Sequence, residues 1–137
     1  LGATIRTDQR EISADDYFLG MFETALAADE LVVAVSFPKP KKAAYAKFPN
    51  PASRYAVVGV MVADTDSGLR VAVTGAGACA YRATAFEDAL SSSLSAEALE
   101  GLTTDSADLN SDLHASAEYR AHLVGVMAKR AVQSLGG

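Results

Sequence analysis

Two β-rich runs on either side of a short turn segment constrain the fold of this chain more than any other feature. The runs extend from Tyr55 to Ala63 and from Leu69 to Ala80, and Asp64-Thr-Asp-Ser-Gly68 lies between them. Strand-forming residues around an Asp/Ser/Gly turn predict an antiparallel hairpin. Gly75 and Gly77 interrupt the second run, which indicates either a bulge or a close backbone approach.

More strands are predicted before the hairpin. The segment from Leu31 to Phe37 is β-rich and stops at a proline, and the segment from Ala43 to Phe48 alternates. This alternation puts Tyr45 and Lys47 on one side of the strand and Ala44, Ala46 and Phe48 on the other. The stretch from Pro49 to Arg54 is predicted to be a loop, because prolines lack the amide donor that a strand needs.

Near the start of the sequence, Ala3 to Thr7 is predicted to be a strand that enters a turn. Ser13 precedes two aspartates and is predicted to cap a short helix by accepting from the amide three residues on. This helix is expected to continue through Tyr17 and Phe18 and to end at Gly20.

From residue 83 onward the hydrophobic period becomes helical. Thr84-Ala-Phe-Glu87 predicts a capping box for a short helix through Leu90, and Ser95 is placed to cap another from Ala96 to Leu102. Ser116 to Leu135 predicts the longest helix, which Gly136-Gly137 would stop. Strands followed by helices predict an α+β fold with two layers. We expect an antiparallel sheet of three to four strands with the helices packed on one face.

Composition excludes several function classes. The 137 residues carry a net charge of −5, which argues against a nucleic-acid partner. No apolar stretch is long enough to predict a membrane span. Cys79 is the only cysteine, so neither an internal disulfide nor an iron–sulfur cluster is expected, and a reducing, cytoplasmic setting fits. The basic cluster Lys39, Lys41 and Lys42 is either a solvated turn or a contact for an anion or a partner.

The residues do not predict a self-sufficient active site or a metal site. His114 and His122 are eight positions apart, so they are not the i, i+4 pair that binds zinc on a helix. No Gly-x-Ser-x-Gly elbow is present, and Gly75-Ala-Gly77 lies inside a predicted strand. A small hydrolase that uses His114 or His122 is kept as a hypothesis, and no residue is predicted to be catalytic.

Several segments in order resemble the medium subunit of the molybdenum hydroxylase family, carbon monoxide dehydrogenase type. The resemblance covers nearly the whole chain, and its most specific elements are Ala44-Tyr-Ala-Lys-Phe48 and Ala115-Ser-Ala-Glu-Tyr-Arg-Ala-His-Leu123. The other matching segments are Asp15-Asp-Tyr-Phe18, Phe22-Glu-Thr-Ala-Leu26, Asp29-Glu-Leu-Val-Val-Ala-Val-Ser-Phe-Pro38, Pro49-Asn-Pro-Ala-Ser-Arg-Tyr55, Val73-Thr-Gly-Ala-Gly77, Asp112-Leu-His114 and Lys129-Arg-Ala131.

The resemblance implies a division of labour among three subunits of an oxidoreductase. A large subunit holds molybdopterin, a small one holds iron–sulfur clusters, and the medium one holds FAD and passes electrons to an external acceptor. The three form a heterotrimer, which is expected to dimerise. Residues 1–38 would end the second FAD-binding subdomain, and residues 41–137 would form the flavoprotein C-terminal domain. The glycine-rich segments that grip the FAD pyrophosphate lie earlier in the family's subunit, so FAD would be bound largely by sequence outside this chain.

Two residues are expected to bind the cofactor by this resemblance. Lys47 matches a lysine that contacts FAD in the xanthine dehydrogenase branch, and Val32 matches an apolar FAD contact there. A lysine supplies charged donors to a polar edge, and a β-branched side chain packs against a flat ring. The alternatives are a solvated strand lysine and an ordinary core valine.

The loop from Pro49 to Tyr55 matches a segment that borders the flavin in these relatives. NAD-reducing members carry acidic residues there, whereas this loop has none. The resemblance therefore implies a quinone or another acceptor rather than NAD. The predicted function is to help close the flavin site and support electron transfer. The alternative is a subunit-assembly module without direct cofactor contact.

Overall fold

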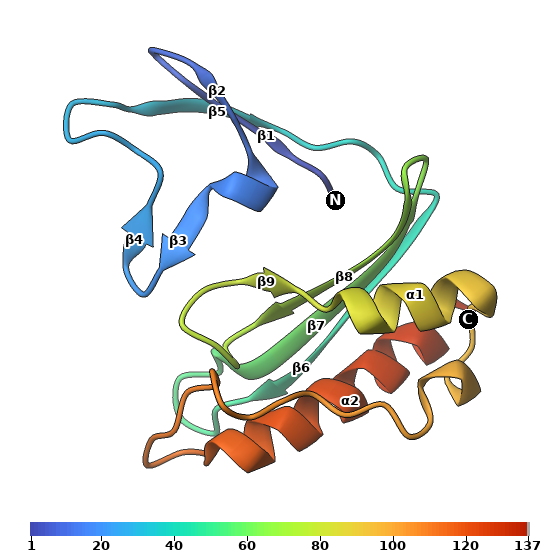
Figure 1. Cartoon of the computed structure of the whole chain (residues 1–137). Helices are drawn as coiled ribbons and strands as arrows, with labels where there is room; N and C mark the ends of the chain where they lie inside the picture. Colours follow the sequence, from blue (N-terminus) through green and yellow to red (C-terminus); the bar gives the residue numbers. More distant parts are fainter. Residues whose placement is uncertain (137) are drawn as a thin grey trace.

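The computed structural model describes residues 1–136; Gly137, part of the expected helix stop, lies outside them. The chain divides into an N-terminal unit and a larger sheet with two helices (Figure 1). We call residues 1–36 the N-terminal unit and the sheet β6–β9 the main sheet. The N-terminal unit contains β1 (Thr4–Thr7), β2 (Glu11–Ser13), the 3₁₀ turn η1 (Ala14–Asp16), β3 (Phe18–Gly20), β4 (Glu23–Thr24) and β5 (Val32–Ser36). The rest contains β6 (Lys42–Pro49), β7 (Ala56–Thr65), β8 (Gly68–Thr74), β9 (Tyr81–Arg82), α1 (Thr84–Ser92), η2 (Glu97–Leu99) and α2 (Ala117–Leu135).

The main sheet is antiparallel, with the strand order β6-β7-β8-β9. The predicted hairpin is confirmed as β7 and β8, with Thr65 opposite Gly68 in the register. The hydroxyl of Thr65 donates to the carbonyl oxygen of Gly68 at 2.7 Å and closes the turn. The second strand is shorter than expected, because it ends at Thr74 and the backbone turns at Gly75, where φ is +78°.

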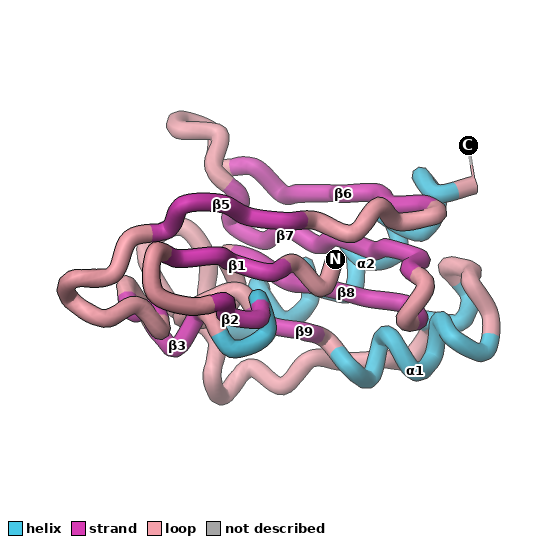
Figure 2. Tube along the Cα trace, turned by 90° about the horizontal axis from the view of Figure 1, so that it is seen from above, coloured by secondary structure: helices cyan, strands magenta, loops and turns pink. Residues whose placement is uncertain are grey.

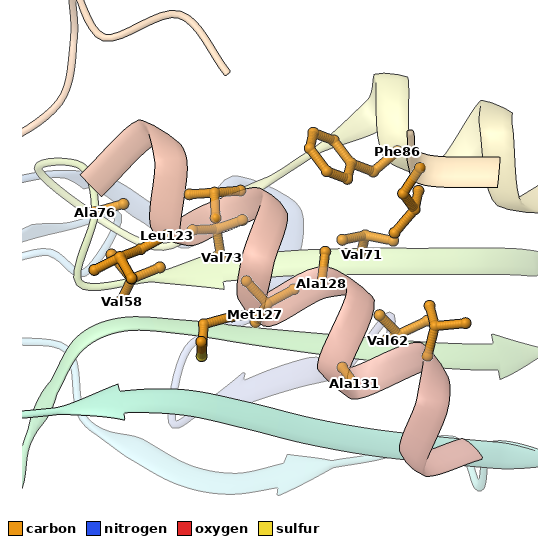
Figure 3. Packing of buried hydrophobic residues seen from close by; sticks show 14 of the residues in the cluster. Val58, Val62, Val71, Val73, Ala76, Phe86, Leu123, Met127, Ala128 and Ala131 are labelled. Atoms are coloured by element: carbon orange, nitrogen blue, oxygen red, sulfur yellow. The ribbon is translucent and has the colours of Figure 1, made fainter. Parts of the chain in front are cut away.

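The core lies between one face of the main sheet and the two helices. Val58, Val60 and Val62 alternate along β7 and are fully buried, and they face α2 (Figure 3). The neighbouring strands continue this face with the pairs Val60–Val73 and Ala46–Val60. α2 packs on β6 and β7, while α1 packs on β8. The expected α+β arrangement of two layers is therefore confirmed.

The long helix forms where its sequence predicts. Ser116 is the N-cap, and its side chain accepts a hydrogen bond from the amide of Tyr119. Capping of this kind satisfies one of the amides that a helix start leaves unpaired. The buried residues of α2 recur at helical spacing, which gives the apolar face that covers the sheet: Leu123, Val124, Met127, Ala128, Ala131, Val132 and Leu135.

The N-terminal unit has its own small sheet, in the order β2-β1-β5, and the separate hairpin β3–β4. Ile5 and Ile12 pair across β1 and β2 and are buried. The strand expected at Leu31–Phe37 is confirmed as β5, which pairs antiparallel with β1. β5 is an edge strand of this sheet, and most of its side chains are exposed.

The expected short helix through Tyr17 and Phe18 is wrong. Ser13 accepts from the amide of Asp15, two residues on, and caps only the 3₁₀ turn η1. Phe18 and Gly20 then belong to β3, because the chain turns back at Met21-Phe22 and pairs with β4. A hairpin this close to the cap leaves no room for a helical turn.

Two further helix predictions are wrong in detail, although Ser95 accepts a hydrogen bond from the amide of Ala98 as a cap would. α1 forms as expected, but its N-cap is Ala83 and no side chain caps it. The carboxylate of Glu87 does not reach back to the helix start, because it accepts from the amide of Val71 at 2.9 Å. The helix expected at Ala96–Leu102 is only the 3₁₀ turn η2, since Gly101 follows it with a φ of +76°.

Candidate functional site

The face of the main sheet opposite the helices is not covered by its own domain. We call it the open face, and it presents the alternate residues of each strand. The N-terminal unit stands over this face, as the view from above shows (Figure 2). The side chains of the open face come from β6, β7, β8 and β9: Tyr45, Lys47, Met61, Arg70, Ala72, Thr74 and Arg82.

Lys47 lies on the open face, as the alternation predicts, and it is exposed. Its Nζ donates a hydrogen bond to the carbonyl oxygen of Arg54 at 2.8 Å. Arg54 belongs to the loop that follows β6 and has a φ of +65°, a conformation that is strained for a residue with a Cβ. Lys47 therefore holds this loop against the strand and keeps two further ammonium protons free for another acceptor.

A glycine beside Lys47 makes room for an aromatic side chain. Lys47 is directly opposite Gly59 in the register. A Cβ at Gly59 would collide with the hydroxyl of Tyr45, and it would lie 2.8 Å from Oγ1 of Thr74. The end of the Tyr45 side chain therefore crosses over Gly59. An ammonium, a phenol and a hydroxyl are thereby brought together on the open face.

The loop from Asn50 to Tyr55 is built by local hydrogen bonds. Asn50 is buried, and its side-chain oxygen accepts from the amides of Ala52 and Ser53. The amide of Arg54 donates to the carbonyl oxygen of Asn50 at 3.0 Å. The predicted loop is confirmed, except that Pro49 still pairs with Ala56 at the end of β6. The loop is thus an ordered border of the open face.

Val32 is placed on the other unit. It lies at the start of β5 opposite Thr7, and 42% of its surface is exposed, so it is not an ordinary core valine. Val32 and Lys47 belong to different sheets, and no hydrogen-bonded strand connects them within residues 1–136. The two expected cofactor residues therefore lie on different units, Val32 on the N-terminal unit and Lys47 on the open face of the main sheet.

Asp15 joins the two units. Its Oδ2 lies 3.2 Å from Nη1 of Arg70 and 3.3 Å from Nη1 of Arg82, both on the open face. Arg82 in turn donates through Nε to Glu87 at 2.8 Å, and this hydrogen bond raises the pKa of Arg82. The sequence reasoning did not identify these residues. Alternation could have indicated Arg70, because it places the arginine on the face opposite Val71.

A cleft of about 870 Å³ lies between the two units. One wall is the β3–β4 hairpin, and the other is formed by Tyr55 and the loops that follow β8 and precede α2. Phe18, Met21 and Phe22 of the hairpin are exposed. Cys79, the free thiol, also lines the cleft, and its Sγ lies 3.9 Å from the carbonyl oxygen of Phe18. The cleft is mainly apolar in its lining.

Neither histidine is part of a catalytic arrangement. His114 and His122 are exposed, and each imidazole lies against a tyrosine ring, Tyr55 and Tyr119 respectively. In the part of the chain that the structure describes, no hydrogen bond joins either imidazole to a serine or a carboxylate, and no cluster of His, Cys, Asp and Glu is suited to a metal ion. The hypothesis of a small hydrolase therefore has no geometric support.

The chain resembles known proteins over nearly its whole length. The family model of the CO dehydrogenase flavoprotein C-terminal domain matches residues 43–135. The nicotine 6-hydroxylase medium subunit of Paenarthrobacter nicotinovorans is 36% identical over 138 residues, which cover 93% of this chain and 49% of that protein.

Solved structures have the same fold. Reconstituted CO dehydrogenase from Oligotropha carboxidovorans superposes with a TM-score of 0.80 at 26% identity, over 98% of this chain and 53% of that one. Quinoline 2-oxidoreductase from Pseudomonas putida 86 gives a TM-score of 0.77 at 27% identity, over 98% and 52% respectively. The chain spans about half the length of these relatives.

Proposed function

The chain belongs to the CO dehydrogenase flavoprotein C-terminal domain family, and on this premise we propose that it closes one side of an FAD site in an oxidoreductase subunit. The resemblance to the medium subunit of molybdenum hydroxylases is confirmed by the family match and by the nicotine 6-hydroxylase subunit. The class of an oxidoreductase subunit fragment is confirmed with it.

One observation carries the proposal: Lys47 lies on the face of the main sheet that is turned away from the helices and toward the N-terminal unit. The Lys47 ammonium is exposed on that face, and its hydrogen bond to Arg54 leaves two of its protons available to a ligand. The expected apolar contact, Val32, stands on the unit over this face and keeps 42% of its surface exposed. A large planar ligand between the units would therefore meet a charged donor on one side and a β-branched side chain on the other.

The donor set of the open face fits one part of a flavin. Lys47 Nζ has protons beyond the one given to Arg54, and Tyr45 and Thr74 add hydroxyls beside it over Gly59. Donors of this kind suit the carbonyl edge of a polar heterocycle. FAD, when bound, would accept electrons from the iron–sulfur side and release them to an external acceptor. The chain's own residues would bind, orient and shield it.

The loop from Asn50 to Tyr55 would border the same cofactor. Its closure by Asn50 and by the Lys47–Arg54 hydrogen bond gives it a defined shape. It presents Ser53, Arg54 and Tyr55 and no carboxylate. We propose a quinone or another acceptor rather than NAD, since an acidic residue of the kind found in NAD-reducing relatives is absent from this loop.

The domain division and the partners belong to the same proposal. Residues 1–38 would end the second FAD-binding subdomain, and residues 41–137 would form the C-terminal domain. The partners would be a large molybdopterin subunit and a small iron–sulfur subunit, in a heterotrimer that dimerises in the cytoplasm. Within residues 1–136, no helix has both the length and the hydropathy to cross a bilayer.

A subunit-assembly module without cofactor contact is the second candidate. The exposed apolar side chains of the N-terminal unit favour it: Phe18, Leu19, Met21, Phe22, Leu31, Val33 and Val35. Surfaces of this kind commonly mark an interface with another chain or domain. An assembly module accounts for the exposed apolar side chains at the tip of the β3–β4 hairpin, but it gives no role to Lys47.

The test is to measure FAD affinity in the natural protein that contains this chain. Three proteins are compared: the wild type, the variant Lys47→Ala and the control variant Lys42→Ala. Lys42 is an exposed lysine at the other end of the same strand. A hydrogen bond to a charged group contributes about 1.5–3 kcal/mol, so we expect Lys47→Ala to weaken FAD binding by roughly tenfold or more. Lys42→Ala should bind as the wild type does. Equal FAD affinity and equal flavin reduction rates in all three proteins would favour the assembly module.

A further inference from the structure

The two units meet through very few contacts. No strand or helix of the N-terminal unit packs along an element of the other part, within residues 1–136. The ion pairs between the units are those of Asp15 with Arg70 and Arg82. The remaining polar contact is the long one between Cys79 and the carbonyl oxygen of Phe18. The relative placement of the two units is therefore not fixed by a shared hydrophobic core.

We propose that Asp15 is a positioning residue that fixes the N-terminal unit over the open face and so sets the spacing between Val32 and Lys47. This inference rests on the proposed function for its consequence for FAD. The geometric part stands on its own, because a single carboxylate oxygen bridges two arginines of a different sheet.

Arg82 is held in place by a contact that does not involve the N-terminal unit. Arg82 is anchored by two hydrogen bonds to Glu87, whose carboxylate is buried against the amide of Val71. The Arg70 side chain is only 19% exposed, and it lies beside Gly2 of the N-terminal unit, so its burial is part of the same contact between the units. An exposed ion pair is weak mainly because two long side chains must be ordered. For Arg82 that entropy is already lost to the hydrogen bonds with Glu87, so its ion pair with Asp15 retains more of its electrostatic attraction.

Asp15 is also presented by a rigid element. Asp15 lies in η1, and its backbone amide donates a hydrogen bond to the side chain of Ser13, the N-cap of this turn. The turn that follows β2 lies on the side of the N-terminal unit that faces β9 (Figure 1), and its Asp15 carboxylate contacts Arg70 of β8 and Arg82 of β9. The neighbouring Asp16 is exposed and forms no ion pair among residues 1–136, which makes it a matched control.

Loss of the bridge would leave the connection from Phe37 to Lys41 as the main link. This segment has no secondary structure, and it joins β5 to β6. The side chain of Asp15 is 47% exposed and belongs to neither hydrophobic core. Its substitution should therefore leave each unit folded while the angle between the units varies more widely.

The experiment measures the distance between the units directly. Spin labels are placed at Glu11→Cys on β2 and Gln133→Cys on α2, both exposed, in a Cys79→Ser background of the natural protein. Distance distributions are then compared for the wild type, Asp15→Asn, Asp15→Glu, Arg70→Gln and Asp16→Asn. FAD affinity and thermal unfolding are measured on the same proteins.

We expect a narrow distribution for the wild type and for Asp16→Asn, and a broadened one for Asp15→Asn and Arg70→Gln at an unchanged unfolding temperature. Asp15→Glu should restore much of the narrow peak, because it retains the carboxylate. FAD affinity should fall about fivefold in the broadened variants, as expected for the loss of a pair at the upper end of the surface range.

An unchanged distribution in Asp15→Asn and Arg70→Gln would overturn the inference. A broadened distribution with Asp16→Asn as well would also overturn it, since the effect would then come from charge alone. If the distribution broadens as expected but no protein in the series binds FAD, the bridge is supported and the proposed function fails. The two failures are thus distinguishable.

Discussion

The buried guanidinium of Arg120 donates to the carbonyl oxygen of Gly75 at 3.0 Å and so connects the first turn of α2 to the end of β8. The same nitrogen donates to the carbonyl oxygen of Val57 at 2.6 Å, and the other terminal nitrogen donates to Asp112 at 2.8 Å. Two strand ends and the loop before the helix therefore share one side chain. This explains why an arginine stands on the otherwise apolar face of α2.

Substitution of Arg120 by alanine should destabilise the protein by about 3 kcal/mol, because buried carbonyl oxygens would lose their donors. The control is Arg130→Ala, an exposed arginine of the same helix, which should change stability by less than about 0.5 kcal/mol. Urea unfolding of the three proteins measures the difference. Equal midpoints would show that water replaces the guanidinium without cost.

The glycines of the chain should respond to alanine in opposite directions. Gly75 has a φ of +78°, and a Cβ there would collide with the carbonyl oxygen of Ala56 and lie 2.7 Å from that of Val57. Gly75→Ala should therefore cost about 2 kcal/mol or more.

Gly125 lies inside α2, and a Cβ there meets no atom within 4 Å. Gly125→Ala should stabilise the protein by about 0.5–1 kcal/mol through helix propensity. Thermal unfolding distinguishes the two directions. A loss of stability in Gly125→Ala would contradict the expectation that a methyl group fits there without a clash.

The hydroxyl of Tyr81 is buried, and no group of residues 1–136 accepts its proton. Burial also raises the pKa of Tyr81. Because a buried donor without a partner is costly, Tyr81→Phe should leave stability unchanged or raise it by up to about 1 kcal/mol. The half-exposed Tyr119, changed to Phe, serves as the comparison in denaturant unfolding. A clear loss of stability in Tyr81→Phe, without a similar loss in Tyr119→Phe, would show that this hydroxyl forms a hydrogen bond.

Glu30 should make stability depend on pH in the acid range. Hydrogen bonds from Arg10, from the amide of Ala27 and from Thr7 lower the pKa of Glu30 from 4.5 to about 2. A folded-state pKa below the unfolded value means that the contribution is fully present above pH 4.5 and is lost as the pH falls toward about 2.

Glu30→Gln should therefore be less stable than the wild type at neutral pH. The difference in unfolding free energy should shrink as the pH falls from 4.5 to about 2. Unfolding free energies measured across the range, with the exposed Glu23→Gln as a control, test the sign. A difference that grows toward low pH would contradict the assignment.

Hydrophobic periodicity predicted the main sheet and the long helix correctly. Alternation of Ala44, Ala46 and Phe48 placed Lys47 on the opposite side of β6, and the structure agrees. Local rules failed where a distant group competes for the same side chain. Glu87 has the spacing of a capping box, yet it binds the amide of Val71 on β8, which is distant in sequence.

The site was only partly predictable for the same reason. Lys47 and Val32 came from resemblance, whereas Asp15, Arg70 and Arg82 meet only after the N-terminal unit folds over the sheet. Contacts between residues 55 to 67 positions apart leave no local pattern. Arg120 shows the opposite case, because an arginine inside an apolar helical stripe is itself a signal of a buried network.

The connection between β5 and β6 runs through Pro38 and Pro40. Proline fixes the φ angle, so this tether samples fewer conformations than a glycine- or serine-rich linker of the same length and resists collapse. A short tether keeps the two surfaces that it joins at a high effective concentration, which is on the order of millimolar for short flexible linkers. Opening of the Asp15 bridge would thus be followed by its re-formation, because the tether prevents the two units from diffusing apart.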